Sequence, residues 1–419
     1  MTSIAAEPWF QAPALRRVFA LLNVDGGEAR VVGGAVRNAL LGLPGGDVDL
    51  ATTWHPEDVA ERAKTAGIKV VATGIDHGTV TLVVDGVPYE VTTLREDLAT
   101  DGRRAEVAFG SGWKEDAARR DFTINALYAN SEGEIFDYVG GLADIESRTL
   151  RFIGNAAERV AEDYLRILRF FRFFAHFGSG RPDAEGLRAC AQARAKLATL
   201  SAERVWTEMK KLLSAADPGR ALLWMRQAGV LGEVLPETEK WGIDAIPALI
   251  TAEKTFSWAP DPLLRLAAMI PPDSERIAAM ASRLRLSKAE AAYLVRFAEA
   301  PEIAAALPDA ALDRALYRHD AEGTIARLKL SLASARRKAE TDPAFLAETA
   351  AFQRLLARAE KWRRPAFPLT GADVLKAGVA PGPQVGTLLS QLENFWIERN
   401  FSVDRATLVA RLESLVQAR

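Results

Sequence analysis

Strand-like sequence is confined to the first third of this 419-residue chain. Short runs rich in Val, Ile, Thr and Tyr alternate there with glycine turns, which is the pattern of strands in a small sheet. The dipeptide Asp85-Gly86, between two such runs, is a strong signal for a β-hairpin. Strands are predicted at residues 69–72, 79–84, 87–94 and 134–138, and helices at residues 35–41 and 56–66. This part is therefore predicted to be an α+β domain that ends near Ser147.

After Ser147 the strand signals vanish, and Ala, Leu, Glu and Arg dominate the sequence. These residue types favour helices, and Pro and Gly interrupt them as they do between helices. The interruptions lie at residues 178–182, 217–218, 258–262, 271–272 and 365–368. We therefore predict three parts: an α+β domain over residues 1–147, a helical part over residues 148–235, and a second helical part over residues 236–419.

Composition limits the class of protein. Hydrophobic residues make up 49% of the chain, which is enough for the cores of two to four domains. The single cysteine, Cys190, excludes an internal disulfide and a cysteine-rich zinc site, and it fits the cytoplasm. The N-terminus has no signal-peptide pattern, and no uninterrupted apolar run reaches the length of a membrane span. We therefore expect neither export nor membrane insertion.

The formal net charge of -2 argues against a protein that coats nucleic acid through bulk charge. Any contact with RNA must then come from a local basic surface, although most basic clusters on helices are simply solvated. The candidate surfaces lie at residues 103–104, 119–120, 159–172, 210–211 and 361–364.

A glycine–arginine turn near residue 33 has the composition of a phosphate-binding site. Gly33 and Gly34 can adopt backbone angles that other residues avoid, so a phosphate can approach the main chain. A helix that begins near Ala35 would point its free N–H groups at that anion, and Arg37 adds a positive charge.

Two acidic residues follow this turn. Gly45 and Gly46 lead into a strand, where residues at i and i+2 point to the same face, so Asp47 and Asp49 can hold Mg²⁺ side by side. Taken alone, an Asp-x-Asp pattern is more often the solvated face of an edge strand. Glu90 lies in the strand after the hairpin and is the natural third carboxylate across the sheet, although a surface strand residue would look the same.

A second dense motif covers residues 115–127, where an acidic run changes to a basic one on entering a predicted helix. Arg120 can form charge-assisted hydrogen bonds with a triphosphate or a ribose. Asp121 and Asn125 lie four residues apart on one predicted helical face, where they can fix this arginine and reach a sugar hydroxyl.

A third motif covers residues 158–174 and carries Asp163, Arg166 and Arg169 at i, i+3 and i+6 of a predicted helix. A structural helix stabilised by ion pairs shows the same pattern. A carboxylate accepts hydrogen bonds and a guanidinium donates them. Cytosine and adenine offer an amino donor beside a ring acceptor, whereas uracil and guanine offer the reverse. An Asp–Arg pair is thus complementary to C and A and mismatched to U and G.

Together these motifs resemble the class II tRNA nucleotidyltransferase and poly(A) polymerase family. Its opening motif joins Gly-Gly-x-Val-Arg-Asp and Leu-Leu-Gly to a later Asp-x-Asp, and this chain departs from it at Asn38, whose amide can still accept a hydrogen bond. Residues 119–126 resemble the family's Arg-Arg-Asp-Phe-Thr-Ile-Asn-Ala element, and residues 162–166 its Glu-Asp-x-x-Arg motif. Weaker matches lie at residues 201–209, 369–375 and 378–386.

The resemblance implies a fold and a domain plan. Residues 1–147 would form a polymerase β-like nucleotidyltransferase head with a small mixed sheet. Residues 148–235 would form an all-helical neck that carries the base-recognition helix. Residues 236–419 would form a helical body and tail that bind tRNA. The segment between Asp97 and Glu115 suggests a mobile loop, which the family links to the change from C to A addition.

The resemblance also implies roles for residues. Asp47 and Asp49 would bind the metal, and Glu90 would complete or support that site. Asp163 and Arg166 would read the incoming base. The other nucleotide-binding residues would be Gly33, Gly34, Arg37, Arg120, Asp121, Asn125 and Arg169, and Glu203 and Arg204 would brace the base-reading helix.

The activity implied is Mg²⁺-dependent addition of C, C and A to tRNA 3′ ends from CTP and ATP, without a nucleic-acid template. A poly(A) polymerase or a partial C- or A-adding relative shares the head motifs and stays open as an alternative. An alternative of another class is a non-catalytic RNA-binding protein that keeps the fold. No DNA partner is expected.

Overall fold

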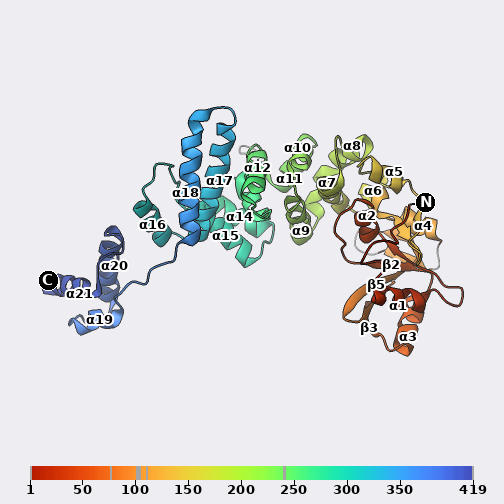
Figure 1. The fold of residues 1–419 in the computed structure, drawn as a ribbon, viewed down its shortest axis with the longest axis horizontal. Helices are drawn as coiled ribbons and strands as arrows, with labels where there is room; N and C mark the ends of the chain where they lie inside the picture. Colours follow the sequence, from red (N-terminus) through yellow and green to blue (C-terminus); the bar gives the residue numbers. More distant parts are fainter. Residues whose placement is uncertain (1, 76–77, 101–104, 110–111, 239–241, 418–419) are drawn as a thin grey trace. The chain divides into compact units, whose positions relative to one another are not determined.

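The structure is a computed structural model that describes residues 2–75, 78–100, 105–109, 112–238 and 242–417. The basic pair at residues 103–104 lies outside the described residues. The chain divides into two compact units, Met1–Pro236 and Glu237–Arg419 (Figure 1). The three-part domain plan stays a prediction.

A seven-stranded mixed sheet forms the centre of the first unit, in the order β3-β4-β5-β2-β1-β8-β9. Strands β2 and β5 run parallel, and every other neighbouring pair is antiparallel. The strands are β1 (Ala29–Val32), β2 (Asp49–Thr52), β3 (Lys69–Gly74), β4 (Thr79–Val84), β5 (Val87–Thr93), β8 (Leu127–Ala129) and β9 (Ile135–Asp137). The prediction of an α+β domain with a small mixed sheet is confirmed.

Helices α1 (Pro13–Leu22) and α3 (Pro56–Thr65) cover one face of this sheet. Alternate residues of β4, namely Val80, Leu82 and Val84, are buried there, while their neighbours along the strand are only half-buried. This alternation is the period-2 pattern of a strand with one face in the core. The face beneath α1 and α3 is therefore apolar.

The other face of the sheet carries a second apolar cluster and, beside it, acidic groups. Val32, Ala51 and Tyr128 belong to this cluster, together with α4 (Trp113–Ala118). The register pairs Val32 with both Asp49 and Tyr128, and directly paired residues point to the same face. Asp49 therefore points to the face opposite α1 and α3.

Several predicted elements are confirmed. Helices form at α2 (Gly34–Leu40) and α3, and the hairpin turn places Asp85 and Gly86 at φ 51° and 82° between β4 and β5. One prediction is wrong: the segment expected to be a loop contains β6 (Arg95–Thr100) and β7 (Ala105–Phe109), which pair as a separate two-stranded sheet.

The predicted helix through Asp121 and Asn125 is also wrong. Helix α4 ends at Ala118, and residues Thr123–Asn125 form a short 3₁₀ turn, η2, that leads into β8. A β-bridge between Phe122 and Phe152 fixes the segment before this turn in an extended conformation. Pairing of β8 with β1 outweighs the local helix propensity of the sequence.

The rest of the first unit is helical, as predicted. Its longest helix, α7, buries Phe170, Phe171 and Phe174 on one side and contacts α9 and α10. Cys190 is buried in α8. The helices are α5 (Gly141–Glu146), α6 (Ala156–Glu162), α7 (Leu165–Phe177), α8 (Ala184–Ala193), α9 (Ala202–Leu213), α10 (Gly219–Gln227) and α11 (Val230–Val234).

The second unit contains helices and turns but no strand within residues 242–417. Glu253 and Arg265 form a buried ion pair between α12 and α13. Among the described residues, no helix combines the length and the apolar character that crossing a membrane requires. The helices are α12 (Ile246–Phe256), α13 (Pro262–Met269), α14 (Ser274–Arg283), α15 (Lys288–Glu299), α16 (Asp309–Arg318), α17 (Ala321–Ala339), α18 (Leu346–Lys361), α19 (Gly371–Lys376), α20 (Pro383–Glu398) and α21 (Arg405–Gln417).

Candidate active site

Three predicted acidic residues are near neighbours around the start of β2. Asp49 is the first residue of β2, and the parallel register pairs it directly with Glu90 of β5, so their side chains share a face. Asp47 lies two residues earlier and is exposed. The pKa of Asp49 is raised to about 6 by burial first, then by the charges of Glu90 and Asp47, while Arg120 acts in the opposite direction. The three carboxylates and Arg120 are therefore near neighbours.

This arrangement fits a hard divalent cation. Carboxylate oxygens are the hard ligands that such ions prefer, and the mutual repulsion that raises the pKa of Asp49 is relieved by a bound cation. Among the residues that the structure describes, no group of three or more His, Cys, Asp or Glu forms a metal cage.

The glycine turn lies beside these acids, at the end of β1. Gly33 has φ 77° and ψ -120°, a conformation that only glycine adopts without strain. Arg120 Nη1 lies 3.9 Å from the position that a Cβ atom on Gly33 would occupy, and Arg37 Nη2 lies 3.7 Å from the corresponding position on Gly34. Two guanidinium groups therefore flank a backbone turn that a phosphate can approach closely.

Arg37 is fixed by two amide side chains. Its Nε and Nη2 atoms donate to Asn38 Oδ1 at 3.2 and 2.9 Å, and its Nη1 atom donates to Asn125 Oδ1 at 2.5 Å. Asn38 thus supports the arginine as an amide, although the family motif has Asp there. Burial and the charge of Arg172 lower the pKa of Arg37 to about 10, which leaves it protonated at neutral pH.

Arg120 is held by residues that the sequence analysis missed. Its Nε and Nη2 atoms donate to Asp116 Oδ2 at 3.2 and 3.1 Å, and Nε also donates to the Tyr128 hydroxyl at 3.1 Å. The expectation that Asp121 and Asn125 fix Arg120 is therefore wrong. The spacing of Asp116 and Arg120, four residues apart, was the available signal.

Asp121 instead joins the turn to helix α7. Its Oδ2 atom accepts from Arg169 Nε at 2.9 Å, and its Oδ1 atom accepts from Asn125 Nδ2 at 3.1 Å. Burial raises the pKa of Asp121, but the charge and the hydrogen bonds of Arg169 lower it by more. The net pKa of Asp121 is therefore below its usual range. Since Asn125 also binds Arg37, a continuous chain of hydrogen bonds connects α2, η2 and α7.

The predicted base-reading residues lie where α6 meets α7. Asp163 is not on the helix: its φ of -150° ends α6, its Oδ1 atom accepts from Leu165 N at 3.0 Å, and its Oδ2 atom accepts from Arg204 Nη2 at 2.6 Å. Arg166 Nη1 donates to the Arg159 carbonyl oxygen at 2.9 Å and to Glu162. The expectation of one continuous helix through Asp163 is wrong, whereas Arg204 braces this junction as expected.

Asp163 lies close to the hydrogen-bonded chain. Burial lowers the pKa of Arg169, but the charges of Asp121, Glu208 and Asp163 outweigh this effect and raise it. The structure therefore brings Asp163, Asp121 and Arg169 into electrostatic range of one another.

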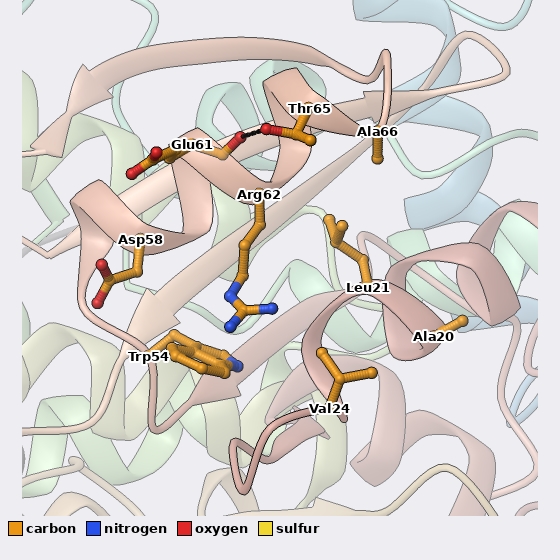
Figure 2. Close-up of a pocket in the computed structure, with 9 residues that line it drawn as sticks. All are labelled: Ala20, Leu21, Val24, Trp54, Asp58, Glu61, Arg62, Thr65 and Ala66. Atoms are coloured by element: carbon orange, nitrogen blue, oxygen red, sulfur yellow. Dashed lines mark hydrogen bonds between the residues drawn. The ribbon is translucent and has the colours of Figure 1, made fainter.

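A hollow of about 550 Å³ lies apart from these residues, between α1 and α3 (Figure 2). The Arg62 guanidinium stacks on the Trp54 ring there, 3.7 Å from the ring centroid, and donates to Asp25 at 2.9 Å. None of the predicted site residues line this hollow. It belongs to the face of the sheet opposite Asp49.

Comparison with known families identifies two regions of the chain. Residues 29–151 match the model of the poly A polymerase head domain, and residues 182–241 match a model described as a probable RNA and SrmB-binding site of polymerase A. The first match contains the acidic residues, the glycine turn and the Asp116–Arg120 pair.

Curated relatives match nearly the whole chain. The mouse CCA tRNA nucleotidyltransferase 1, mitochondrial, is 32% identical over 97% of this chain and 92% of its own length. The CCA-adding enzyme of Lacticaseibacillus paracasei is 34% identical over 92% of each chain. A solved structure of the Bacillus stearothermophilus CCA-adding enzyme in complex with CTP aligns with a TM-score of 0.70 and 26% identity, over 99% of both chains.

Proposed function

The chain belongs to the class II tRNA nucleotidyltransferase and poly(A) polymerase family, and we infer that it is a CCA-adding enzyme that elongates the 3′ ends of tRNA. Its substrates are tRNA, CTP and ATP, and each addition releases pyrophosphate. The observation that carries this conclusion is similarity over nearly the full length to enzymes of that name, together with the Asp49–Glu90 pair beside the glycine turn.

For the metal we propose Mg²⁺, held by Asp47 and Asp49 with Glu90 in support. When bound, such cations favour deprotonation of the tRNA 3′-hydroxyl and neutralise the departing pyrophosphate. The proposal is supported by the cluster of carboxylates around Asp49 and by the divalent-metal use that is general in this family.

We propose that the glycine turn and its flanking arginines bind the triphosphate. Gly33 and Gly34 leave room for phosphate oxygens. A guanidinium group lies within 4 Å of the position that a Cβ atom would occupy on each glycine, Arg120 beside Gly33 and Arg37 beside Gly34. Because the ends of these guanidinium groups are fixed by other side chains, little conformational freedom is lost on binding.

Asp163 and Arg166 are proposed to select the base. Asp163 Oδ2 and the remaining N–H groups of Arg166 provide the acceptor and donors that cytosine and adenine require. Glu162 and Arg204 hold the two residues in place at the start of α7, so the recognition edge is formed by protein alone. The Asp121–Arg169 pair connects this edge to the triphosphate site.

The inference is tested by the products of the reaction. The protein is incubated with tRNA that lacks its last three nucleotides, with CTP, with ATP, and with both, and the 3′ ends are sequenced. The expected product with both nucleotides ends in CCA and grows no further. A long A tail would assign the chain to the poly(A) polymerases, addition of only C or only A would assign it to a partial relative, and no pyrophosphate release would indicate a non-catalytic RNA-binding protein.

For the location in the cell we propose the cytoplasm. The support is that Cys190 is a buried free thiol, as is common in reducing compartments. One relative is named as mitochondrial, so fractionation of cells that produce the natural protein, followed by immunodetection, is the decisive measurement.

A further inference from the structure

We propose that Asp116 is a positioning residue for nucleotide binding, which acts with Tyr128 to aim Arg120 at the Gly33 turn. The proposal rests on the proposed function, because the anion that Arg120 would meet there is the triphosphate of CTP or ATP. It adds to the site two side chains that touch no substrate themselves.

Asp116 is a fully buried carboxylate surrounded by donors. Its Oδ2 atom accepts from Arg120 and from the Tyr128 hydroxyl, the latter at 2.7 Å. Its Oδ1 atom accepts from Arg119 Nε and Nη2 at 2.8 and 2.6 Å. A buried carboxylate with this many donors is held in one orientation, because any rotation would leave buried polar groups unpaired.

The charges of Arg120 and Arg119 favour the ionised form of the Asp116 carboxyl group. Burial raises the pKa of Asp116, but the charges of Arg120 and Arg119 and the hydrogen bond from Tyr128 outweigh this effect, so the pKa lies below its usual range. Burial, followed by the charge of Asp116, raises the pKa of Tyr128, despite the opposing charge of Arg120, and keeps its hydroxyl a donor. The ionised acid and the protonated phenol therefore persist across the physiological range of pH.

Asp116 and Tyr128 contact only one side of the Arg120 guanidinium group. Its Nε and Nη2 atoms are engaged by Asp116 and Tyr128, whereas Nη1 has no hydrogen-bond acceptor among the residues described. That atom lies 3.9 Å from the Cβ position of Gly33, and Arg120 is close enough to Asp49 to lower its pKa. The open end of the guanidinium thus lies between the turn and the proposed metal ligands.

A purely structural ion pair would have no reason to leave a donor open beside a glycine turn. The buried Glu253–Arg265 pair has the same geometry, since both Nε and Nη2 of Arg265 donate to Glu253, but neither residue lies in the unit that holds the site. It serves as the matched control, because it shares the chemistry of a buried acid–arginine pair without a proposed ligand.

The test compares Asp116→Asn with Arg120→Lys and with the double variant, by steady-state kinetics on tRNA that lacks CCA. Loss of a buried charged hydrogen-bond partner predicts that Asp116→Asn raises KM for both CTP and ATP on the order of 10-fold, with kcat changed by less than about 3-fold. If Asp116 acts through Arg120, the double variant will raise KM by no more than about 2-fold beyond Arg120→Lys alone.

Tyr128→Phe is the milder probe, which removes one hydroxyl and keeps the ring. It is expected to raise both KM values about 3-fold, since a neutral hydrogen bond contributes less than a charged one. Glu253→Gln is expected to lower the midpoint of thermal unfolding and leave both KM values unchanged. A wild-type KM in folded Asp116→Asn or Tyr128→Phe, or fully additive effects in the double variant, would overturn the proposal.

Direct binding separates this inference from the proposed function. Calorimetric titration with CTP is expected to give a dissociation constant that rises on the order of 10-fold in Asp116→Asn, in parallel with KM. If the wild type binds CTP and adds nothing to tRNA, the proposed function fails while this shift still decides the role of Asp116. If the wild type completes CCA and the titration shows no shift, the inference fails and the function stands. Failure of the wild type to bind CTP would refute both.

Discussion

The pKa of Asp49 reflects the burial and the charges of the site around it. Asp49 lies at the start of a strand, half-buried, with Glu90 beside it and Asp47 two residues earlier. Burial and these two charges raise its pKa to about 6, which means that the metal-free fold disfavours the ionised carboxylate. The same repulsion is what a divalent cation would remove, so the binding of metal and the stability of the head are linked.

This linkage predicts a dependence of stability on pH. Because the folded pKa is raised from 3.8 to about 6, the stability that Asp49 contributes is fully present below about pH 4 and is lost as the pH rises through about 6. In chelator at pH 7, Asp49→Asn is expected to be more stable than the wild type by roughly 1–2 kcal/mol, after allowance for solvent screening. Urea unfolding at pH 4 and pH 7 measures the difference, which should vanish at pH 4.

Added Mg²⁺ is expected to stabilise the wild type at pH 7 and to have little effect on Asp49→Asn. Equal stability of the two proteins in chelator at pH 7 would contradict the assigned repulsion.

Asp47 permits a test of activity at the same scale. Asp47→Ala is expected to abolish incorporation of both CMP and AMP, because it removes a proposed metal ligand while leaving the exposed surface otherwise intact. Binding of tRNA, measured by filter retention, is expected to stay near the wild-type level. Asp25→Ala, which alters an exposed acid on the other face of the sheet, is the control and should retain activity. Turnover by Asp47→Ala would refute its role.

At the scale of elements, the β1–α2 turn shapes the site through its backbone. Gly33→Ala is expected to destabilise the head by about 1–3 kcal/mol, because alanine is strained at φ 77° and ψ -120°. It should also raise KM for both nucleotides, since the methyl group would occupy the space beside Arg120. The control is Gly26→Ala, which is strained at φ 80° but has no atom within 4 Å of the new Cβ. A similar rise of KM in both variants would show that strain alone is responsible.

The junction of α6 and α7 predicts base selectivity. Exchange of the two side chains, in the double variant Asp163→Arg and Arg166→Asp, reverses donors and acceptors at the proposed recognition edge. Incorporation of UMP and GMP should rise relative to CMP and AMP, as measured by competition among the four triphosphates. Arg204→Lys, which keeps the positive charge beside Asp163, is the control that should keep C and A preferred. If the exchanged variant keeps the wild-type preference for C and A, this pair does not read the base.

Strand patterns in the sequence predicted that Asp49 and Glu90 face each other across the sheet, because that geometry follows from short-range rules. The Asp85-Gly86 hairpin sets the strand that carries Glu90, whereas β2 begins only at Asp49, so Asp47 precedes the strand in which the sequence pattern placed it. What the sequence could not provide was the second partner of Arg120, since the Tyr128 hydroxyl reaches Arg120 and Asp116 only after β8 pairs with β1.

The break at Asp163 was hidden for a similar reason. Residues on both sides of it favour helix, so the local pattern predicts one continuous element. The extended conformation of Asp163 is stabilised by its hydrogen bond from Leu165 N and by Arg204, which lies 41 positions further along the chain. The contact from Arg204 is tertiary and leaves no signature in the neighbouring sequence.

At the scale of the whole molecule, every candidate site residue lies in the first compact unit, Met1–Pro236. All seven strands of its sheet pair within that unit. The hydrogen bonds of α7 and α9 that position the proposed base-reading residues also form within it. The second unit has its own apolar clusters, which include Leu328, Leu355, Leu388 and Trp396.

A fragment of residues 1–236 is therefore expected to unfold cooperatively and to bind CTP with a dissociation constant within about 3-fold of the full chain, because its core and its nucleotide contacts are complete. Its affinity for tRNA should fall at least about 10-fold if the second unit contributes the tRNA contacts that the resemblance implies. Circular dichroism and titrations of both ligands measure these properties. Undiminished affinity for tRNA would place the RNA contacts in the first unit.

The parallel pairing of β2 with β5 also dictates when activity can first appear during synthesis. Asp49 and Glu90 are 41 positions apart in sequence and become neighbours only once the hairpin between them has formed and returned beside β2. Arg169 arrives later still, from a helix beyond the sheet. A polypeptide still emerging from the ribosome is thus inert until more than a third of it has left the exit tunnel and folded, so chains shorter than this cannot compete for nucleotides.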